Sequence, residues 1–118
     1  MAQINIANVT TIKPVLQSVT VGTSLAAILD VPTDSCMRLD SIYLSNIDGT
    51  NTATASVAIS KDDGSSQRYL IKNVPIPPGA SISVLDTPIY LDETDLLYHQ
   101  ASAAGDIDIV VSGVEMID

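Results

Sequence analysis

Short segments in which apolar and polar residues alternate constrain the fold of this chain most strongly. In residues 54–60, TASVAIS, one side carries Ala55, Val57 and Ile59, and the other carries threonine, serine and alanine. This period of two is typical of a strand with one buried face. The best helix candidate, SLAAIL at residues 24–29, is short and stops before a proline, so it could equally be a strand. The alternation therefore predicts an all-β protein.

Turn residues separate the predicted strands, and their spacing indicates a sandwich or barrel. Asp48-Gly49, Asp63-Gly64 and Gly105 each lie between two strands, and we expect the strands flanking each turn to be antiparallel neighbours. We predict a single antiparallel β-sandwich of jelly-roll type at residues 14–118, after an extended N-terminal arm at residues 1–13. The strands are expected at residues 15–21, 24–30, 37–46, 54–60, 67–72, 81–85, 88–91, 96–103 and 107–116.

The amino-acid composition decides what fills the core. A chain of 118 residues forms one domain, and this one contains no phenylalanine or tryptophan and four tyrosines. Its interior must therefore be filled by Val, Ile, Leu and Ala. We expect a thin aliphatic core.

A proline-rich segment, NVPIPPGASISVL at residues 73–85, interrupts the strands. Proline has no amide hydrogen, so this segment cannot be a central strand and must lie at a sheet edge or cross between sheets. Pro78-Gly79 should close it with a turn before the next strand begins. We interpret it as a rigid crossover that also protects an edge from unwanted pairing.

The last predicted strand is apolar on both faces, which is typical of a strand in the middle of a structure or against another subunit. Ile107, Ile109 and Val111 lie on one side, opposite three apolar residues on the other. Together with the arm and the polar loop after residue 46, this strand is our candidate assembly interface. The interface residues predicted are Ile4, Ile6, Val9, Ile12, Asp48, Asn51, Val110, Val114 and Met116.

The charge of the chain excludes two classes of partner. The net charge is −9, and residues 73–118 contain eight acids and no lysine or arginine. Such a surface repels phosphate backbones and anionic lipids, so we expect neither nucleic acid nor membrane as a partner. The N-terminal sequence lacks the charged and apolar regions of a targeting signal, so we expect synthesis in the cytoplasm.

No catalytic motif is present in the sequence. His99 is the only histidine, and alternation places it with Leu97 and Ala101, opposite Tyr98. The single cysteine, Cys36, excludes a disulfide within the chain and a cysteine-rich metal site. We therefore expect no enzymatic activity and no cofactor.

Two groups of carboxylates leave calcium binding open as an alternative. Asp92 and Asp95 flank Glu93, and Asp106 and Asp108 form a second group. Hard cations are held by several oxygens from such loops, and calcium would bind if the fold brought the two groups together. The spacing is not that of an EF-hand, and turns at strand ends collect aspartate in any case. A solvated acidic edge is the interpretation that we prefer.

From about residue 39 to its end, the chain resembles a group of small virion structural proteins of tailed bacteriophages. In that pattern a proline-glycine turn precedes a leucine-aspartate pair, a YL-acidic-acidic segment, an Ala-Ser-Ala strand and an acidic last strand. This chain has Thr94 where the pattern usually has glycine, so the turn there is expected to differ. The matching segments are SIYLSNIDGTN, TASVAIS, DDGSS, YLIKNVPIPPGASISVLD, PIYLDETD and HQASAAGDIDIVVSGVEM.

The resemblance implies a β-sandwich that assembles in many copies on a virion. We expect a capsid decoration (cement) protein that stabilises the phage head, acting as a homo-oligomer, with a trimer favoured, on a major capsid protein or another virion protein. A neck, tail or baseplate component is the alternative within this class. A calcium-dependent ligand-binding module is the alternative from another class.

Overall fold

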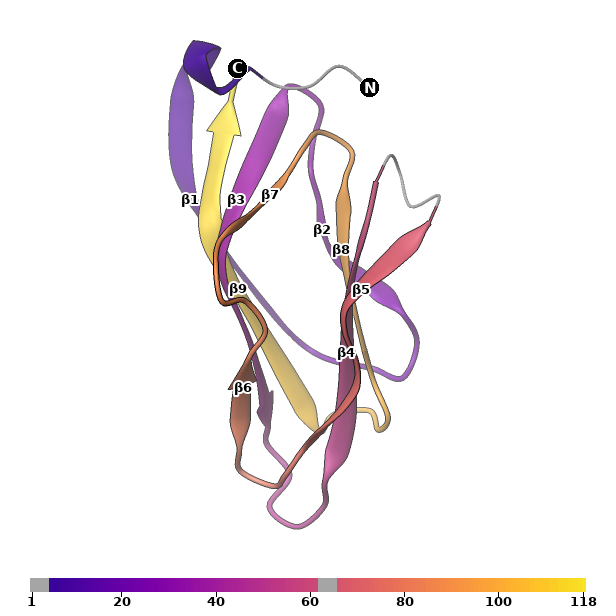
Figure 1. Cartoon of the computed structure of the whole chain (residues 1–118). Helices are drawn as coiled ribbons and strands as arrows, with labels where there is room; N and C mark the ends of the chain where they lie inside the picture. Colours follow the sequence, from indigo (N-terminus) through magenta and orange to yellow (C-terminus); the bar gives the residue numbers. More distant parts are fainter. Residues whose placement is uncertain (1–4, 62–65) are drawn as a thin grey trace.

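The computed structural model describes residues 5–61 and 66–118, and they form two packed antiparallel β-sheets (Figure 1). The predicted all-β sandwich is confirmed, and each predicted strand has a counterpart. A short 3-10 helix, η1 (Ile6–Asn8), comes first, and no helix in the described ranges has the length and apolarity to cross a membrane. The strands are β1 (Thr11–Thr20), β2 (Ala26–Asp30), β3 (Ser35–Asn46), β4 (Ala53–Ser60), β5 (Gln67–Ile76), β6 (Ser81–Ser83), β7 (Ile89–Leu91), β8 (Leu96–Ala101) and β9 (Ile107–Ile117).

The chain passes back and forth between the two sheets. The first sheet has the order β1-β9-β3-β6, with β7 also paired to β3, and the second has the order β2-β8-β4-β5. Most neighbours within a sheet are therefore distant in the sequence, and most connections cross between the sheets. The expectation that each turn joins antiparallel neighbours holds for β4 and β5 but is wrong for the other two turns. The loops at Asp48-Gly49 and Gly105 cross from one sheet to the other instead.

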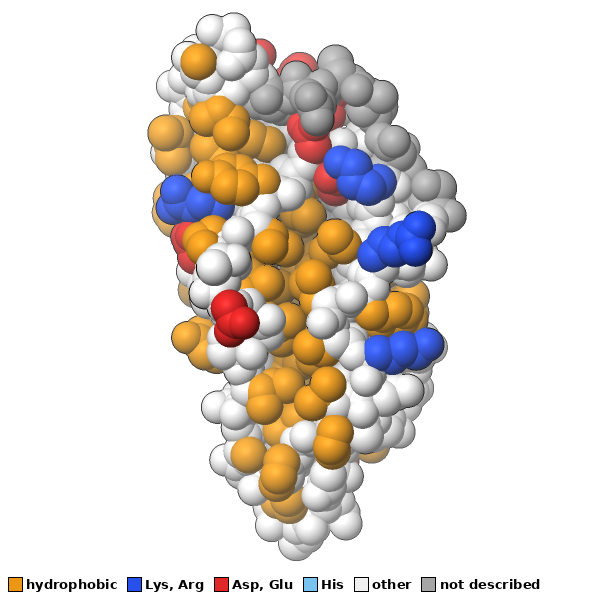
Figure 2. Space-filling model, viewed as in Figure 1, with side chains coloured by type: hydrophobic (Ala, Val, Ile, Leu, Met, Phe, Trp, Pro, Cys, Tyr) orange, Lys and Arg blue, Asp and Glu red, His pale blue; other side chains and the backbone are white. Residues whose placement is uncertain are grey.

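Aliphatic side chains from both sheets fill the interior, as the composition predicted. The largest fully buried side chains include Leu39, Ile42 and Leu44 of β3 and Ile107 and Ile109 of β9. Hydrophobic side chains reach the surface along the edge of the sandwich where β5 of the second sheet faces β6 and β7 of the first. Figure 2 shows a lengthwise band of hydrophobic side chains there, with lysine and arginine side chains gathered on the β5 side.

The proline-rich segment behaves as the sequence predicted. β5 is the edge strand of the second sheet, and it runs through Pro75 to Ile76. The chain then crosses to β6 in the first sheet through a turn in which the Ala80 amide donates to the Pro77 carbonyl (3.1 Å). Gly79 has φ +73°, the left-handed value that a type II turn requires at this position.

The N-terminal arm is shorter than the predicted residues 1–13, because β1 begins at Thr11 and pairs with the end of β9. The sequence around Lys13 and Pro14 did not reveal this pairing, since Pro14 suggests a boundary. Proline is tolerated here because β1 is an edge strand. Of the arm's predicted interface residues, Ile4 lies outside the described residues.

Candidate assembly face

The outward side of the first sheet carries a row of apolar side chains from four strands. The pairing of β1, β9, β3 and β7 places these side chains beside one another, because residues in register on neighbouring strands point to the same side. We call this surface the assembly face. Its successive cross-strand rows are Ile12, Met116 and Cys36; Pro14, Val114, Arg38 and Tyr90; Leu16, Ser112 and Ser41; and Ser18, Val110 and Tyr43.

Large apolar side chains on this face are unusually exposed. The exposed fraction is 70% for Leu16, 68% for Ile12, 57% for Tyr90, 48% for Tyr43 and 37% for Val110. Single exposed apolar residues are normal on a soluble protein, but a contiguous set on one sheet face marks an interaction surface. The face therefore has the character of a surface that another molecule covers.

The core does not require this outward apolarity. In β9 the inward residues Ile107, Ile109 and Val111 are fully buried, and they belong to the hydrophobic core. Val110 and Val114 alternate with them and point away from the interior. An antiparallel sheet with one wet face normally carries polar residues there. The strand that the sequence showed to be apolar on both sides is therefore central in its sheet and also faces outward.

Charges on the assembly face are few and paired. The Arg38 guanidinium donates from Nε to Oδ1 of Asp40 (2.9 Å), which raises the pKa of the arginine. The Thr20 hydroxyl donates to Oδ1 of Asp108 (2.9 Å) at the far end of the face. Depletion of charge together with exposed tyrosine is the composition of interface cores. Beside Asp108, a hollow of about 400 Å³ is lined by Ser18, Val19, Thr20 and Val110.

Cys36 and Met116 lie at the other end of the face but are covered, with exposed fractions of 5% and 6%. Burial raises the pKa of the Cys36 thiol, and the negative charge of Asp92 raises it further. The cysteine is therefore held as a protonated, packed thiol and not as a reactive surface group.

Three of the predicted interface residues lie exposed or half-exposed on this face, namely Ile12, Val110 and Val114. Met116 shares their side of the sheet but is buried. Sequence reasoning missed Leu16, Tyr43 and Tyr90. The available signal was the apolar residue on the second side of each strand, but alternation alone does not say which side faces solvent.

The remaining predicted interface residues lie away from the assembly face. Ile6, with an exposed fraction of 52%, and Val9 lie at the N-terminal end, beside the start of β1. Asp48 and Asn51 lie in the β3–β4 loop at the opposite end of the sheet (Figure 1). There Asp48 accepts hydrogen bonds from Thr50 and Asn51, which lower the pKa of its carboxyl group. This loop is a turn that satisfies its own polar groups.

The two carboxylate groups considered for calcium are separated by the length of β8. Asp92 and Asp95 precede β8, whereas Asp106 and Asp108 follow it, so the fold does not bring the two groups together. Asp95 is 3% exposed, and its Oδ2 accepts from the Lys61 ammonium (3.1 Å) and the Asp92 amide (2.9 Å). In the described part of the chain, no group of three or more His, Cys, Asp and Glu side chains could hold a metal ion.

His99 lies inside the sandwich, on the same side of β8 as Leu97 and Ala101, as alternation predicted. Its exposed fraction is 5%, and its Nδ1 has no hydrogen-bond partner among the described residues. Burial lowers the pKa of this imidazole. The side chain is a neutral core residue in this position.

Comparisons with known proteins show the fold of the chain but no family. No known protein family matches the sequence, and no curated protein matches it. A subunit of the Bacillus endospore appendages, described as disulfide-linked pili, has a TM-score of 0.52 at 16% identity, covering 91% of this chain and 87% of its own. A capsid protein of Helicobacter pylori bacteriophage KHP30 has a TM-score of 0.54 at 8% identity, covering 92% and 90%. At such low identity these likenesses establish a shared β-sandwich fold.

Proposed function

We propose that the chain is a non-enzymatic structural protein of a bacteriophage virion, which assembles through the outward face of its first sheet. The observation that carries this proposal is the assembly face itself. It presents Ile12, Leu16, Tyr43, Tyr90 and Val110 to solvent on one surface, outside the hydrophobic core.

The structural neighbours support an assembly role. One neighbour comes from a bacteriophage capsid and the other from pili, and an assembly role fits both settings. The pili are described as disulfide-linked, but Cys36, the one cysteine of this chain, is buried. In the proposed assembly, copies of this chain would therefore associate by noncovalent burial, which is what an apolar face provides.

Decoration of the head is the role that we propose within the virion. A decoration protein stabilises a shell by covering apolar surface on itself and on its neighbours, so a broad sheet face with few charges suits that task. The sequence resemblance to small virion proteins is consistent with this role and with a neck, tail or baseplate position. We expect a homo-oligomer, with a trimer favoured, that also contacts a major capsid protein. A neck or tail component would use the same face.

The test is whether the chain is present in purified phage particles. Particles produced with the wild-type chain, with Leu16→Asp or with the control Ile47→Asp would be banded by density and analysed by quantitative mass spectrometry. Ile47 is 56% exposed and follows β3 in the loop, so it offers a matched apolar residue off the assembly face. Heads and tails would be separated before analysis.

We expect the wild-type and Ile47→Asp chains in the head fraction at a fixed copy number, with Leu16→Asp reduced at least about tenfold. That estimate follows because full burial of a leucine is worth about 1.5 to 3 kcal/mol and each 1.4 kcal/mol changes affinity about tenfold. Recovery in the tail fraction would favour the neck or tail role. A chain found only among soluble proteins would refute the proposal.

A further inference from the structure

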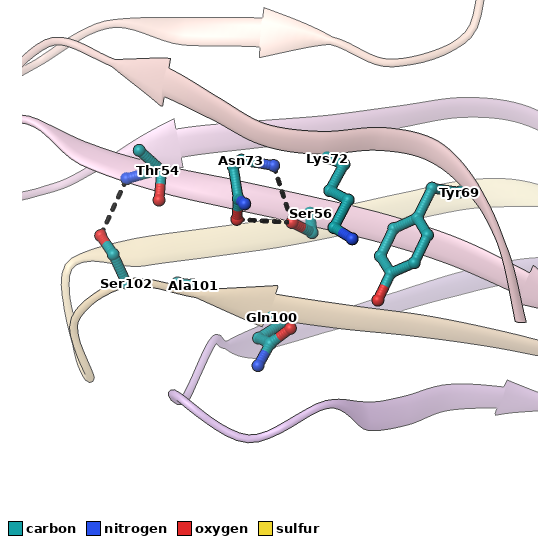
Figure 3. A pocket seen from close by; sticks show the side chains of 8 residues that line it. All are labelled: Thr54, Ser56, Tyr69, Lys72, Asn73, Gln100, Ala101 and Ser102. Atoms are coloured by element: carbon teal, nitrogen blue, oxygen red, sulfur yellow. Dashed lines mark hydrogen bonds between the residues drawn. The ribbon is translucent and has the colours of Figure 1, made fainter.

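The second sheet carries a polar groove on its outward side, on the opposite side of the molecule from the assembly face. The groove has a volume of about 430 Å³ and crosses β8, β4 and β5 (Figure 3). Its size is within the range of small-molecule sites. Ser56 of β4, which is 3% exposed, lies between Gln100 of β8 and the side chains of β5.

Two irregularities in β5 form this groove. Ala55 pairs with Val74 and Val57 pairs with Ile71, so Lys72 and Asn73 together lie opposite Ser56. The next pair joins Ala58 to Tyr69, which leaves Leu70 as a second extra residue. Bulges of this kind re-aim side chains, and they are common beside binding sites. As a result Tyr69, Lys72 and Asn73 all line the groove, although strict alternation would place Lys72 on the other side of β5 from Tyr69 and Asn73.

Asn73 is held in place by the buried serine. Its backbone has φ +52°, a left-handed conformation that asparagine tolerates better than most residues. The Asn73 amide donates to Ser56 Oγ (2.8 Å), and the same hydroxyl donates to the Asn73 side-chain oxygen (3.4 Å). This arrangement leaves the Asn73 side-chain NH₂ group without a partner among the described residues. It is a fixed donor at the groove.

Lys72 and Tyr69 form a second fixed pair. The Lys72 ammonium lies 4.9 Å from the centre of the Tyr69 ring, within cation–π distance, and the ring is 40% exposed. The ammonium has three donors, and the structure gives Lys72 no carboxylate partner in the described ranges. The groove is therefore positively charged in a chain whose net charge is −9, and none of its described lining residues is acidic.

Acceptors lie on the opposite wall. Gln100 donates from Nε2 to the Thr23 carbonyl (3.0 Å), which fixes the amide and leaves its Oε1 as an acceptor. Between the two walls, the Thr54 hydroxyl of β4 adds a group that both donates and accepts. Donors on β5 and acceptors on β8 are therefore separated by the width of the groove, and a ligand that spans them must carry both kinds of group.

We propose that this groove binds an acidic saccharide, a sugar that carries a carboxylate such as a hexuronic or sialic acid. The carboxylate would be bound by the Lys72 ammonium and the Asn73 amide, and ring hydroxyls would bond Gln100 and Thr54. The exposed part of the Tyr69 ring would contact the apolar side of the sugar. An extended acidic peptide fits less well, because it would pair along the β5 edge, where Pro75 removes a main-chain donor.

The test uses titration calorimetry at fixed salt, with sialyllactose and trigalacturonate as acidic saccharide probes and lactose and maltotriose as neutral counterparts. A glutamate-rich peptide serves as an acidic probe that is not a saccharide. Lys72→Met removes the cation and Tyr69→Leu removes the ring. Lys13→Met is the matched control, because it makes the same change of charge on β1, in the other sheet. Thermal melts would establish that each variant is folded, as expected for substitutions at exposed positions.

We expect saturable binding of at least one acidic probe, at least tenfold weaker binding of its neutral counterpart, and a loss of at least tenfold in affinity for Lys72→Met but not for Lys13→Met. The inference is refuted if no acidic probe binds below about 10 mM, or if both lysine variants weaken binding equally, which indicates nonspecific attraction. Binding of a glutamate-rich peptide without binding of either sugar would also overturn it. The test does not depend on assembly, so its outcome is separate from that of the proposed function.

Discussion

Replacement of Thr94 by glycine should stabilise the protein. Thr94 is in the turn between β7 and β8, in which the Asp95 amide donates to the Asp92 carbonyl (3.1 Å). Its φ is +65°, and Glu93 before it has no positive φ, so Thr94 occupies the position of a type II turn that favours glycine. This is the position at which the sequence departs from the pattern of the virion proteins that it resembles.

The size of the effect follows from three contributions. A β-branched residue in the left-handed region costs about 1 to 2 kcal/mol. The Thr94 hydroxyl is also buried without a hydrogen-bond partner in the described residues, and such a group costs about 1 to 3 kcal/mol. Against these two gains, glycine makes the unfolded chain more flexible, which lowers the free energy of unfolding by about 0.5 to 1 kcal/mol. We expect a net stabilisation of about 1 to 4.5 kcal/mol, or about 4 °C or more in Tm.

The measurement is urea and thermal denaturation of wild type and Thr94→Gly at one protein concentration. Thr94→Asn should fall between them, because asparagine tolerates the left-handed region better than threonine does. The control is Thr52→Gly, at an exposed loop residue without positive φ, which should lose about 0.5 to 1 kcal/mol. A Thr94→Gly chain that is no more stable than Thr52→Gly would show that the turn stores no strain.

Three further substitutions test the fold. Gly113→Ala should destabilise the protein by at least about 2 kcal/mol in urea denaturation, because the added Cβ would collide with the Arg38 carbonyl on the neighbouring strand. The control Gly49→Ala should be close to neutral, because nothing lies near Gly49 in its loop. Burial lowers the pKa of His99 from its usual 6.5, so as the pH falls the unfolded chain binds this proton before the folded chain does. The free energy of unfolding should therefore stay constant above pH 6.5 and decrease below it. His99→Leu should remove that part of the pH profile. Asn46→Ala should cost about 2 to 4 kcal/mol, because the buried amide donates to the Asn51 and Ile76 carbonyls and accepts from the Asp48 amide; a loss below about 1 kcal/mol would contradict this.

The local features of the fold were predictable from the sequence. Alternation located the strands and placed His99 inside the sandwich, and proline chemistry identified the edge position of β5 and the turn at Gly79. These features depend on a residue and its near neighbours. Turn chemistry was misleading at Asp48-Gly49 and Gly105, because a turn favours a change of direction but does not decide which sheet the next strand joins.

The surfaces were less predictable, because they depend on pairing between distant strands. Leu16 joins Val110 and Tyr43 on one face only because β9 lies between β1 and β3. The groove depends on bulges in β5, which shift Tyr69 and Lys72 away from strict alternation. A sequence read with a fixed period of two has no means of detecting such a shift. The separation of the carboxylate groups by β8 likewise required the structure.

Light scattering of the purified protein tests the central claim, that the outward face of the first sheet is buried by assembly. Wild type, Leu16→Asp and Ile47→Asp would be measured at about 10 and about 100 μM, concentrations that bracket the micromolar range of modest interfaces. We predict a discrete oligomer for wild type and Ile47→Asp, and dissociation towards the monomer for Leu16→Asp. A wild-type monomer at both concentrations, or an oligomer that Leu16→Asp leaves intact, would contradict the claim.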